Sequence, residues 1–154
     1  MKAVFFFFIF NFLLNGLFAQ NITDSVYSES EIILKTSTGD IYGTITVSNK
    51  TNKTPLALII AGSGPTDRDG NSAIGLKTDT YRKLSEEFAK NGISTLRFDK
   101  RGIGKSSQAM TSESEIRFEA YINDVIGWIS LLKSDERFSS INILGHSEGS
   151  LIGM

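Results

Sequence analysis

The chain has 154 residues, with 16 Lys or Arg against 17 Asp or Glu, so its formal net charge at pH 7 is −1. Charges of both signs are mixed along a near-neutral chain, which excludes the strongly basic surface typical of nucleic-acid-binding proteins, and we expect no nucleic acid partner. The absence of cysteine excludes disulfides and lipid attachment through cysteine. The length suffices for one domain at most.

The first residues have the composition of a secretory signal peptide. Lys2 supplies a positive charge, a run rich in Phe, Leu and Ile follows, and the small residue Ala19 marks a cleavage position. The alternative is an uncleaved membrane anchor, but asparagines interrupt a run shorter than the ~20 apolar residues needed to span a bilayer. We expect residues 1–19 to be a signal peptide, 20–28 a polar lead-in, and the protein to be exported to the periplasm or secreted, with no stable membrane span after cleavage.

Residues 29–154 are expected to begin with an antiparallel hairpin. Segments 31–36 and 40–47 are rich in β-formers, and the turn sequence Ser37-Thr38-Gly39-Asp40 separates them.

Three apolar segments of strand length follow, at 56–61, 93–98 and 141–144. Their nearly continuous apolar sequences are typical of strands that are covered on both faces of a sheet.

Two amphipathic helices separate these strands. The first is expected at 78–90, with Thr78 or Asp79 as its N-cap and Asn91-Gly92 at its end. The second has an apolar face formed by Phe118, Ile122, Val125, Ile129 and Leu132. Strands that alternate with helices predict a mostly parallel sheet, because each parallel pair needs a crossover. We therefore expect the loops that begin at Gly62, Asp99 and Gly145 to meet at the carboxyl edge of the sheet.

The last of these loops contains the pattern G-x-S-x-G, as Gly145-His146-Ser147-Glu148-Gly149. In this pattern the serine lies on a sharp turn from strand to helix, where its oxygen is exposed, and the glycines let the strand and helix approach closely. The pattern is short and occurs by chance, so its context must decide its meaning.

Three segments resemble ligand-binding motifs but lack residues that those motifs require. Gly104-Lys105-Ser106 lacks the upstream glycine of a phosphate loop, and the glycines after the first apolar strand lack the third glycine of a dinucleotide loop. Asp67, Asp69 and Asn71 resemble the start of a calcium loop, but glycine and glutamate are missing where that loop needs them. We expect these carboxylates to pair with Arg68 or with nearby backbone amides.

Three motifs in order, Leu58 to Pro65, Arg97 to Ser106 and Gly145 to Gly149, resemble the first half of an α/β-hydrolase. The nearest resemblance is to bacterial carboxylesterases and the serine-aminopeptidase-like branch, and it covers roughly residues 31–154. It implies an α/β fold with a mostly parallel sheet and an N-terminal antiparallel hairpin. It also implies a small-molecule ester or other acyl substrate, with no cofactor and no metal.

The resemblance assigns a role to each motif. Ser147 would be the nucleophile that forms an acyl-enzyme. The backbone amides of Ser63, with Gly64 as the alternative, and of Glu148 would donate to the oxyanion. Gly145 and Gly149 would shape the nucleophile turn. The loop residues Asp99, Arg101 and Gly102 would hold their loop in shape and take no part in chemistry, and the Glu148 side chain would be solvated.

His146 is the single histidine of the chain, but as a sequence neighbour it cannot reach the oxygen of Ser147 in a geometry suited to proton transfer. In the family that the chain resembles, the triad acid and histidine follow the serine, so both are expected beyond residue 154. We therefore expect an α/β-hydrolase fold truncated after the nucleophile turn, inactive and poorly stable when isolated.

The expected function is ester hydrolysis by a serine hydrolase. A peptidase or thioesterase of the same fold, and a binding module that has lost catalysis, are alternatives. The sequence leaves the oligomeric state open.

Overall fold

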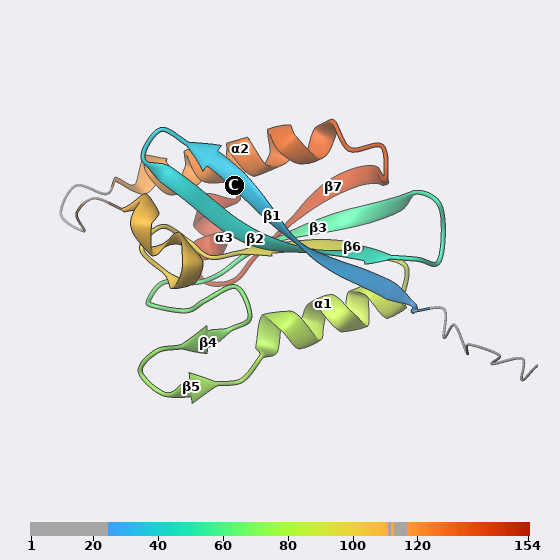
Figure 1. The fold of residues 1–154 in the computed structure, drawn as a ribbon, viewed down its shortest axis with the longest axis horizontal. Helices are drawn as coiled ribbons and strands as arrows, with labels where there is room; N and C mark the ends of the chain where they lie inside the picture. Colours follow the sequence, from blue (N-terminus) through green and yellow to red (C-terminus); the bar gives the residue numbers. More distant parts are fainter. Residues whose placement is uncertain (1–24, 111, 113–116) are drawn as a thin grey trace, which may run out of the picture.

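The computed structural model describes residues 25–110, 112 and 117–154, so the expected signal peptide lies outside the described residues. The strands are β1 Tyr27–Thr36, β2 Gly39–Ser48, β3 Thr54–Ile60, β4 Asn71–Ser72, β5 Leu76–Lys77, β6 Ser94–Phe98 and β7 Phe138–Gly145. The helices are α1 Thr80–Lys90, α2 Phe118–Lys133, α3 Glu148–Ile152 and the 3-10 helix η1 Gly104–Ala109. A five-stranded sheet has the order β1-β2-β6-β3-β7, and β4 and β5 form a second, small sheet (Figure 1).

The predicted hairpin is confirmed and is longer than expected. β1 and β2 pair in antiparallel register from Tyr27 opposite Ser48 to Thr36 opposite Gly39, so β1 starts inside the segment expected to be a polar lead-in. β2 then pairs antiparallel with β6, which attaches the hairpin to the rest of the sheet.

The parallel part of the sheet is also confirmed. β3 lies between β6 and β7 and is parallel to both. Helices α1 and α2 lie on opposite faces of the sheet (Figure 1). On the side of α2, Leu56, Leu58 and Ile60 of β3 pack in one core cluster with Trp128, while Ile59 packs with α1 on the other side. β3 is apolar throughout because both of its faces are covered.

Two expectations about burial are wrong. β7 is an edge strand of the described sheet and not a fully covered one, so Ile143 is 41% exposed. In α2, Phe118 is exposed, whereas Trp128 is fully buried and packs against Phe98 with ring centroids 5.8 Å apart. The side of α2 that faces the sheet is therefore set by Val125, Trp128 and Leu132 and does not extend to the first turn.

Of the two residues expected to cap α1, Thr78 does so and Asp79 does not: the amide of Thr80 donates to Thr78 Oγ1 at 3.4 Å. Asp79 occupies the N-cap position in a left-handed conformation, with φ 52°, and makes no side-chain cap hydrogen bond. Its carboxylate instead accepts a hydrogen bond from Asn71 and pairs with Arg82. The carbonyl of Asp69 accepts a hydrogen bond from the Tyr81 amide at 3.2 Å, so the preceding loop satisfies the start of the helix.

Candidate active site

Three loops meet at the carboxyl edge of the parallel strands, as predicted. Ile60 at the end of β3 is opposite Gly145 at the end of β7, and Ile59 is opposite Arg97 near the end of β6. The amide of His146 continues the pairing with a 3.0 Å hydrogen bond to the carbonyl of Ile60. The chain segments that follow β3, β6 and β7 therefore start side by side.

Ser147 lies between β7 and α3 with φ 53° and ψ −121°, a conformation that residues with a side chain rarely adopt. Such a backbone costs about 1–3 kcal/mol and persists where the surroundings enforce it. The surroundings here are two backbone contacts. A Cβ at Gly145 would lie 2.4 Å from the carbonyl oxygen of Gly149, and a Cβ at Gly149 would lie 2.3 Å from that of Ile60. Only glycine fits at either position, so strand and helix are in direct backbone contact around the serine.

The loop after β3 runs beside this serine. A Cβ added at Gly62 would lie 3.2 Å from the Cβ of Ser147, so no side chain separates the loop backbone from the serine. Ser63 follows directly, and Ser63, Gly64 and Glu148 all line a pocket of about 380 Å³. The predicted oxyanion donors, in the loop after β3 and at the start of α3, thus border the same pocket.

His146 points to helix α1. Its Nδ1 atom is 2.9 Å from the hydroxyl of Tyr81, and the two rings meet edge to face with centroids 6.1 Å apart. Tyr81 is buried in the core cluster beneath α1. The imidazole of His146 thus connects the turn that contains Ser147 to helix α1.

Asp99 follows β6 and is almost completely buried. Its carboxylate accepts hydrogen bonds from the Arg68 amide and Nη2, each at 2.8 Å, and from the Lys105 amide at 3.0 Å. A Cβ at Gly104 would lie 2.6 Å from Asp99 Oδ2, so the loop closes tightly around the carboxylate. Asp99 therefore connects its own loop to the long loop that contains Arg68.

Arg101, which is half-buried, forms an ion pair with the buried Asp124 of α2. Its Nε and Nη2 atoms each donate to one oxygen of that carboxylate at 2.7 Å, and Nη1 donates to the carbonyl of Ala109 at 3.0 Å. Burial raises the pKa of Asp124, and the hydrogen bonds from Arg101 oppose this shift. The adjacent Gly102 has φ +79°, and a Cβ there would lie 2.5 Å from Met110 Cε. Asp124 was missed because it interrupts the apolar face of its helix, which is the signal that could have revealed a buried partner.

The long polar loop is held largely by its own backbone. Asp67 Oδ1 accepts hydrogen bonds from the amides of Asp69 and Asn71 at 2.9 Å and 2.8 Å, as expected for carboxylates that bind nearby amides. Of the two kinds of partner expected, the backbone amides are found at Asp67, whereas Arg68 turns inward to Asp99 and Asp69 pairs with Arg97. Across the described residues, no group of three or more acidic, histidine or cysteine side chains is placed to hold a metal ion.

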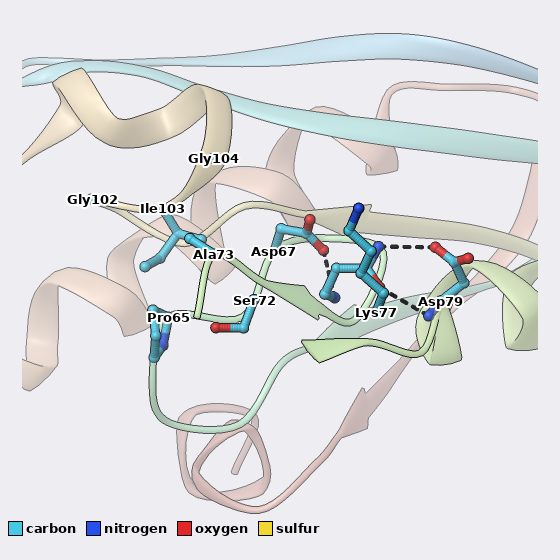
Figure 2. Close-up of a pocket in the computed structure, with 10 residues that line it drawn as sticks. Pro65, Asp67, Ser72, Ala73, Lys77, Asp79, Gly102, Ile103 and Gly104 are labelled. Carbon is cyan, nitrogen blue, oxygen red and sulfur yellow. Dashed lines mark hydrogen bonds between the residues drawn. The ribbon is translucent and has the colours of Figure 1, made fainter. Parts of the chain in front are cut away.

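This loop borders a second pocket, of about 560 Å³, opposite the Gly102–Gly104 segment. Figure 2 shows Pro65 and Ile103 at one end of it and Asp79 at the other, with Asp67 between them. Pro65 and Ile103 also line the smaller pocket that contains Ser63 and Glu148, so the two pockets are neighbours.

Lys100 was missed at the sequence level. Its Nζ donates to the carbonyl of Gly62 at 2.5 Å and to Glu148 Oε2 at 3.2 Å, and it lies 5.6 Å from the centre of the Tyr121 ring. The expectation that the Glu148 side chain is merely solvated is therefore wrong. No periodicity marks Lys100, because it stands in a loop between two other charged residues.

In the part of the chain that the structure describes, none of the helices has the length and apolar character required to cross a membrane.

Comparison with known proteins agrees with this architecture. The family model described as serine aminopeptidase, S33 matches residues 74–154, which is 81 of the 154 residues. Esterase EstD of Thermotoga maritima is 25% identical over 146 residues, which cover 89% of this chain and 34% of EstD. The chain therefore spans about a third of that relative's length.

Solved structures share the fold. Est1E from Butyrivibrio proteoclasticus, solved with ferulic acid bound, has a TM-score of 0.61 at 20% identity, and the match covers 79% of this chain and 44% of Est1E. The α/β hydrolase GrgF from a Penicillium species has a TM-score of 0.64 at 18% identity, with 81% of this chain and 39% of GrgF covered. The sheet order, the converging loops and the family match lead to one conclusion: the chain belongs to the serine aminopeptidase S33 family and has an α/β-hydrolase fold.

Proposed function

We propose that this chain is the nucleophile-bearing part of a serine hydrolase that cleaves carboxylic esters through an acyl-enzyme on Ser147. The observation that carries the proposal is the backbone at Ser147, with φ 53° and ψ −121° between two glycines that admit no side chain. A strained, enforced turn at the carboxyl edge of a parallel sheet is the setting in which a serine oxygen is exposed for attack.

The proposed chemistry has two halves. Ser147 Oγ forms a bond to the acyl carbon and gives its proton to a general base, the carbonyl oxygen becomes an oxyanion, and the base then protonates the departing alcohol. Water, activated by the same base, hydrolyses the acyl-enzyme. The amides of Ser63 and Glu148, which border one pocket, would donate to the oxyanion.

We propose that the general base and its acid partner come from outside these 154 residues. The single histidine, His146, has its Nδ1 at the hydroxyl of Tyr81. The chain also spans only 34% of the length of EstD, which leaves room for further catalytic residues in a longer protein.

Peptide hydrolysis is the second candidate, since the description of the matching family is serine aminopeptidase. The same nucleophile and oxyanion donors serve both reactions, and the substrate decides between them. The rates on p-nitrophenyl acetate and on aminoacyl p-nitroanilides, measured with the full-length protein, separate the two.

The test of the nucleophile is Ser147→Ala in the full-length protein. We expect the hydrolysis of p-nitrophenyl acetate to fall at least about a thousandfold and labelling by a fluorophosphonate to disappear. Ser139→Ala is the matched control, because it removes an exposed serine hydroxyl from the other end of β7, and it should keep both signals. Turnover that persists in Ser147→Ala would mean that another residue is the nucleophile. A wild-type protein that neither turns over esters or peptides nor takes up the label would favour the non-catalytic binding module.

Export is a further part of the proposal and rests on the sequence of residues 1–19. Fractionation of cells that express the full-length protein tests it. A mature protein that begins near Gln20 and lies outside the cytoplasm is expected, and an intact N-terminus in the cytoplasm would contradict it.

A further inference from the structure

The ammonium group of Lys100 is buried at the edge of the candidate active site. Its side chain is 6% exposed, and its contacts are the carbonyl of Gly62, the carboxylate of Glu148 and the ring of Tyr121. A buried cation is costly unless its surroundings compensate it, so this group is held in place by strong contacts.

Each hydrogen-bond partner of Lys100 is linked to one proposed oxyanion donor. The carbonyl of Gly62 shares a peptide group with the amide of Ser63, and the carboxylate of Glu148 is on the residue whose amide is the second donor. A peptide group is planar, so the carbonyl of Gly62 and the amide of Ser63 form one rigid unit and point in opposite directions. A bond from Lys100 to that carbonyl therefore fixes the direction of the Ser63 N–H. The other bond, to the side chain of Glu148, holds the residue whose own amide is the second donor.

We infer that Lys100 is a positioning residue for the oxyanion hole and sets the direction of the Ser63 and Glu148 amides through its contacts with Gly62 and Glu148. The inference rests on the proposed function. It assigns Lys100 no contact with the substrate. Its cation also polarises the Gly62–Ser63 peptide, which makes the Ser63 N–H a stronger donor.

A positioning role for Lys100 predicts a change in kcat that a purely structural role does not predict. The oxyanion exists in the tetrahedral transition state and not in the bound ester, so misdirected donors lower kcat and leave KM nearly unchanged. A residue that contacted the substrate would instead raise KM, and a residue that only held the fold would lower stability without changing kcat of the folded enzyme.

The test is Lys100→Met in the full-length protein, which keeps the length and apolar stem of the side chain and removes its charge. Loss of a whole oxyanion donor lowers kcat about 100- to 1,000-fold, so misdirection is expected to lower it about 10- to 100-fold, with KM within about threefold. Affinity for an aryl trifluoromethyl ketone, whose adduct with serine carries an oxyanion, should fall by the same factor as kcat/KM. Lys100→Arg, which keeps the cation, should recover part of kcat.

The matched control is Lys105→Met, five residues further along the chain in the 3-10 helix η1. Lys105 makes an exposed ion pair with Glu31 at 2.5 Å, and its loss should leave kcat unchanged. Urea unfolding of each variant shows that the assayed protein is folded. If Lys100→Met does not fold, Lys100→Gln replaces it: glutamine is neutral and shorter, so kcat should still fall, by about 10-fold, the lower end of the range expected for Lys100→Met.

An unchanged kcat in folded Lys100→Met, or a loss confined to KM, overturns the inference. The Ser147→Ala variant, run in parallel, separates this failure from failure of the proposed function. If Ser147→Ala is inactive while Lys100→Met has full kcat, the inference about Lys100 fails and the nucleophile stands. If Ser147→Ala keeps the wild-type rate, the proposed function fails and the inference falls with it.

Discussion

The replacement of Gly149 by alanine tests how strictly the backbone around Ser147 is constrained. A Cβ at this position would lie 2.3 Å from the carbonyl oxygen of Ile60 and must move away by about 0.7 Å to reach 3.0 Å. That oxygen cannot yield freely, because it accepts the 3.0 Å hydrogen bond from the amide of His146. Overpacking costs about 1–3 kcal/mol, and the stretched hydrogen bond adds about 1 kcal/mol. Alanine has a higher helix propensity than glycine, which offsets up to about 1 kcal/mol of this loss in stability.

The net expectation is that Gly149→Ala lowers the free energy of unfolding by about 2–3 kcal/mol, measured by urea denaturation of the full-length protein. Ester hydrolysis by the folded variant should also fall, since α3 is displaced from β3 and Ser147 moves with it. Gly75→Ala is the control: it has φ +104° and no atom within 4 Å of the added Cβ, so it has backbone strain without a clash and should keep activity. A Gly149→Ala protein within about 0.5 kcal/mol of wild type and fully active would refute the argument from backbone contact.

Two further predictions concern buried and half-buried carboxylates. Asp124→Asn leaves the half-buried Arg101 without its ion-pair partner at a buried position and should cost about 3 kcal/mol in the free energy of unfolding. Asp135→Asn breaks a pair of the same geometry on the surface and should cost under about 1 kcal/mol, so equal losses in urea would contradict the role of burial. For Glu29, burial raises the pKa, but hydrogen bonds from Thr46 and Arg97 outweigh it and hold the pKa below its ordinary value of 4.5. The unfolded chain then binds more protons in the window below pH 4.5, so this contribution to stability is complete above pH 4.5 and is lost as pH falls through the lowered pKa. Glu29→Gln should make the urea midpoint less sensitive to pH across that window, and equal pH slopes for both proteins would show that Glu29 is not the group responsible.

Hydrophobic periodicity predicted the elements of this fold well because each long strand and helix has an apolar side to cover. The central strand and helix α1 were each located to within a few residues. The small β4–β5 sheet was missed, since its strands are two residues long and carry no period. The edge position of β7 was missed for a different reason: its apolar sequence shows what the strand is made of and not which neighbours it has.

The candidate site was predictable where glycines and a short motif mark it, at Gly145, Ser147 and Gly149. It was not predictable where function depends on a contact between distant segments. Lys100 reaches a carbonyl 38 residues earlier and a carboxylate 48 residues later, and no local pattern encodes either contact. The same is true of Arg101 and Asp124: the sequence predicts that Arg101 holds its loop in shape, but no local pattern identifies Asp124, 23 residues later, as its partner.

The strand order also fixes when the turn at Ser147 can form. The β1–β2 hairpin closes between neighbours in sequence, whereas the pairing of Ile60 with Gly145 joins residues 85 positions apart. Long-range pairings of this kind bear a larger entropic cost of loop closure and form late in folding. Gly149 packs against the carbonyl of Ile60, so the backbone that exposes the serine oxygen exists only after β7 has joined β3. A partly folded chain therefore lacks this geometry, and any reactivity of Ser147 is coupled to completion of the sheet.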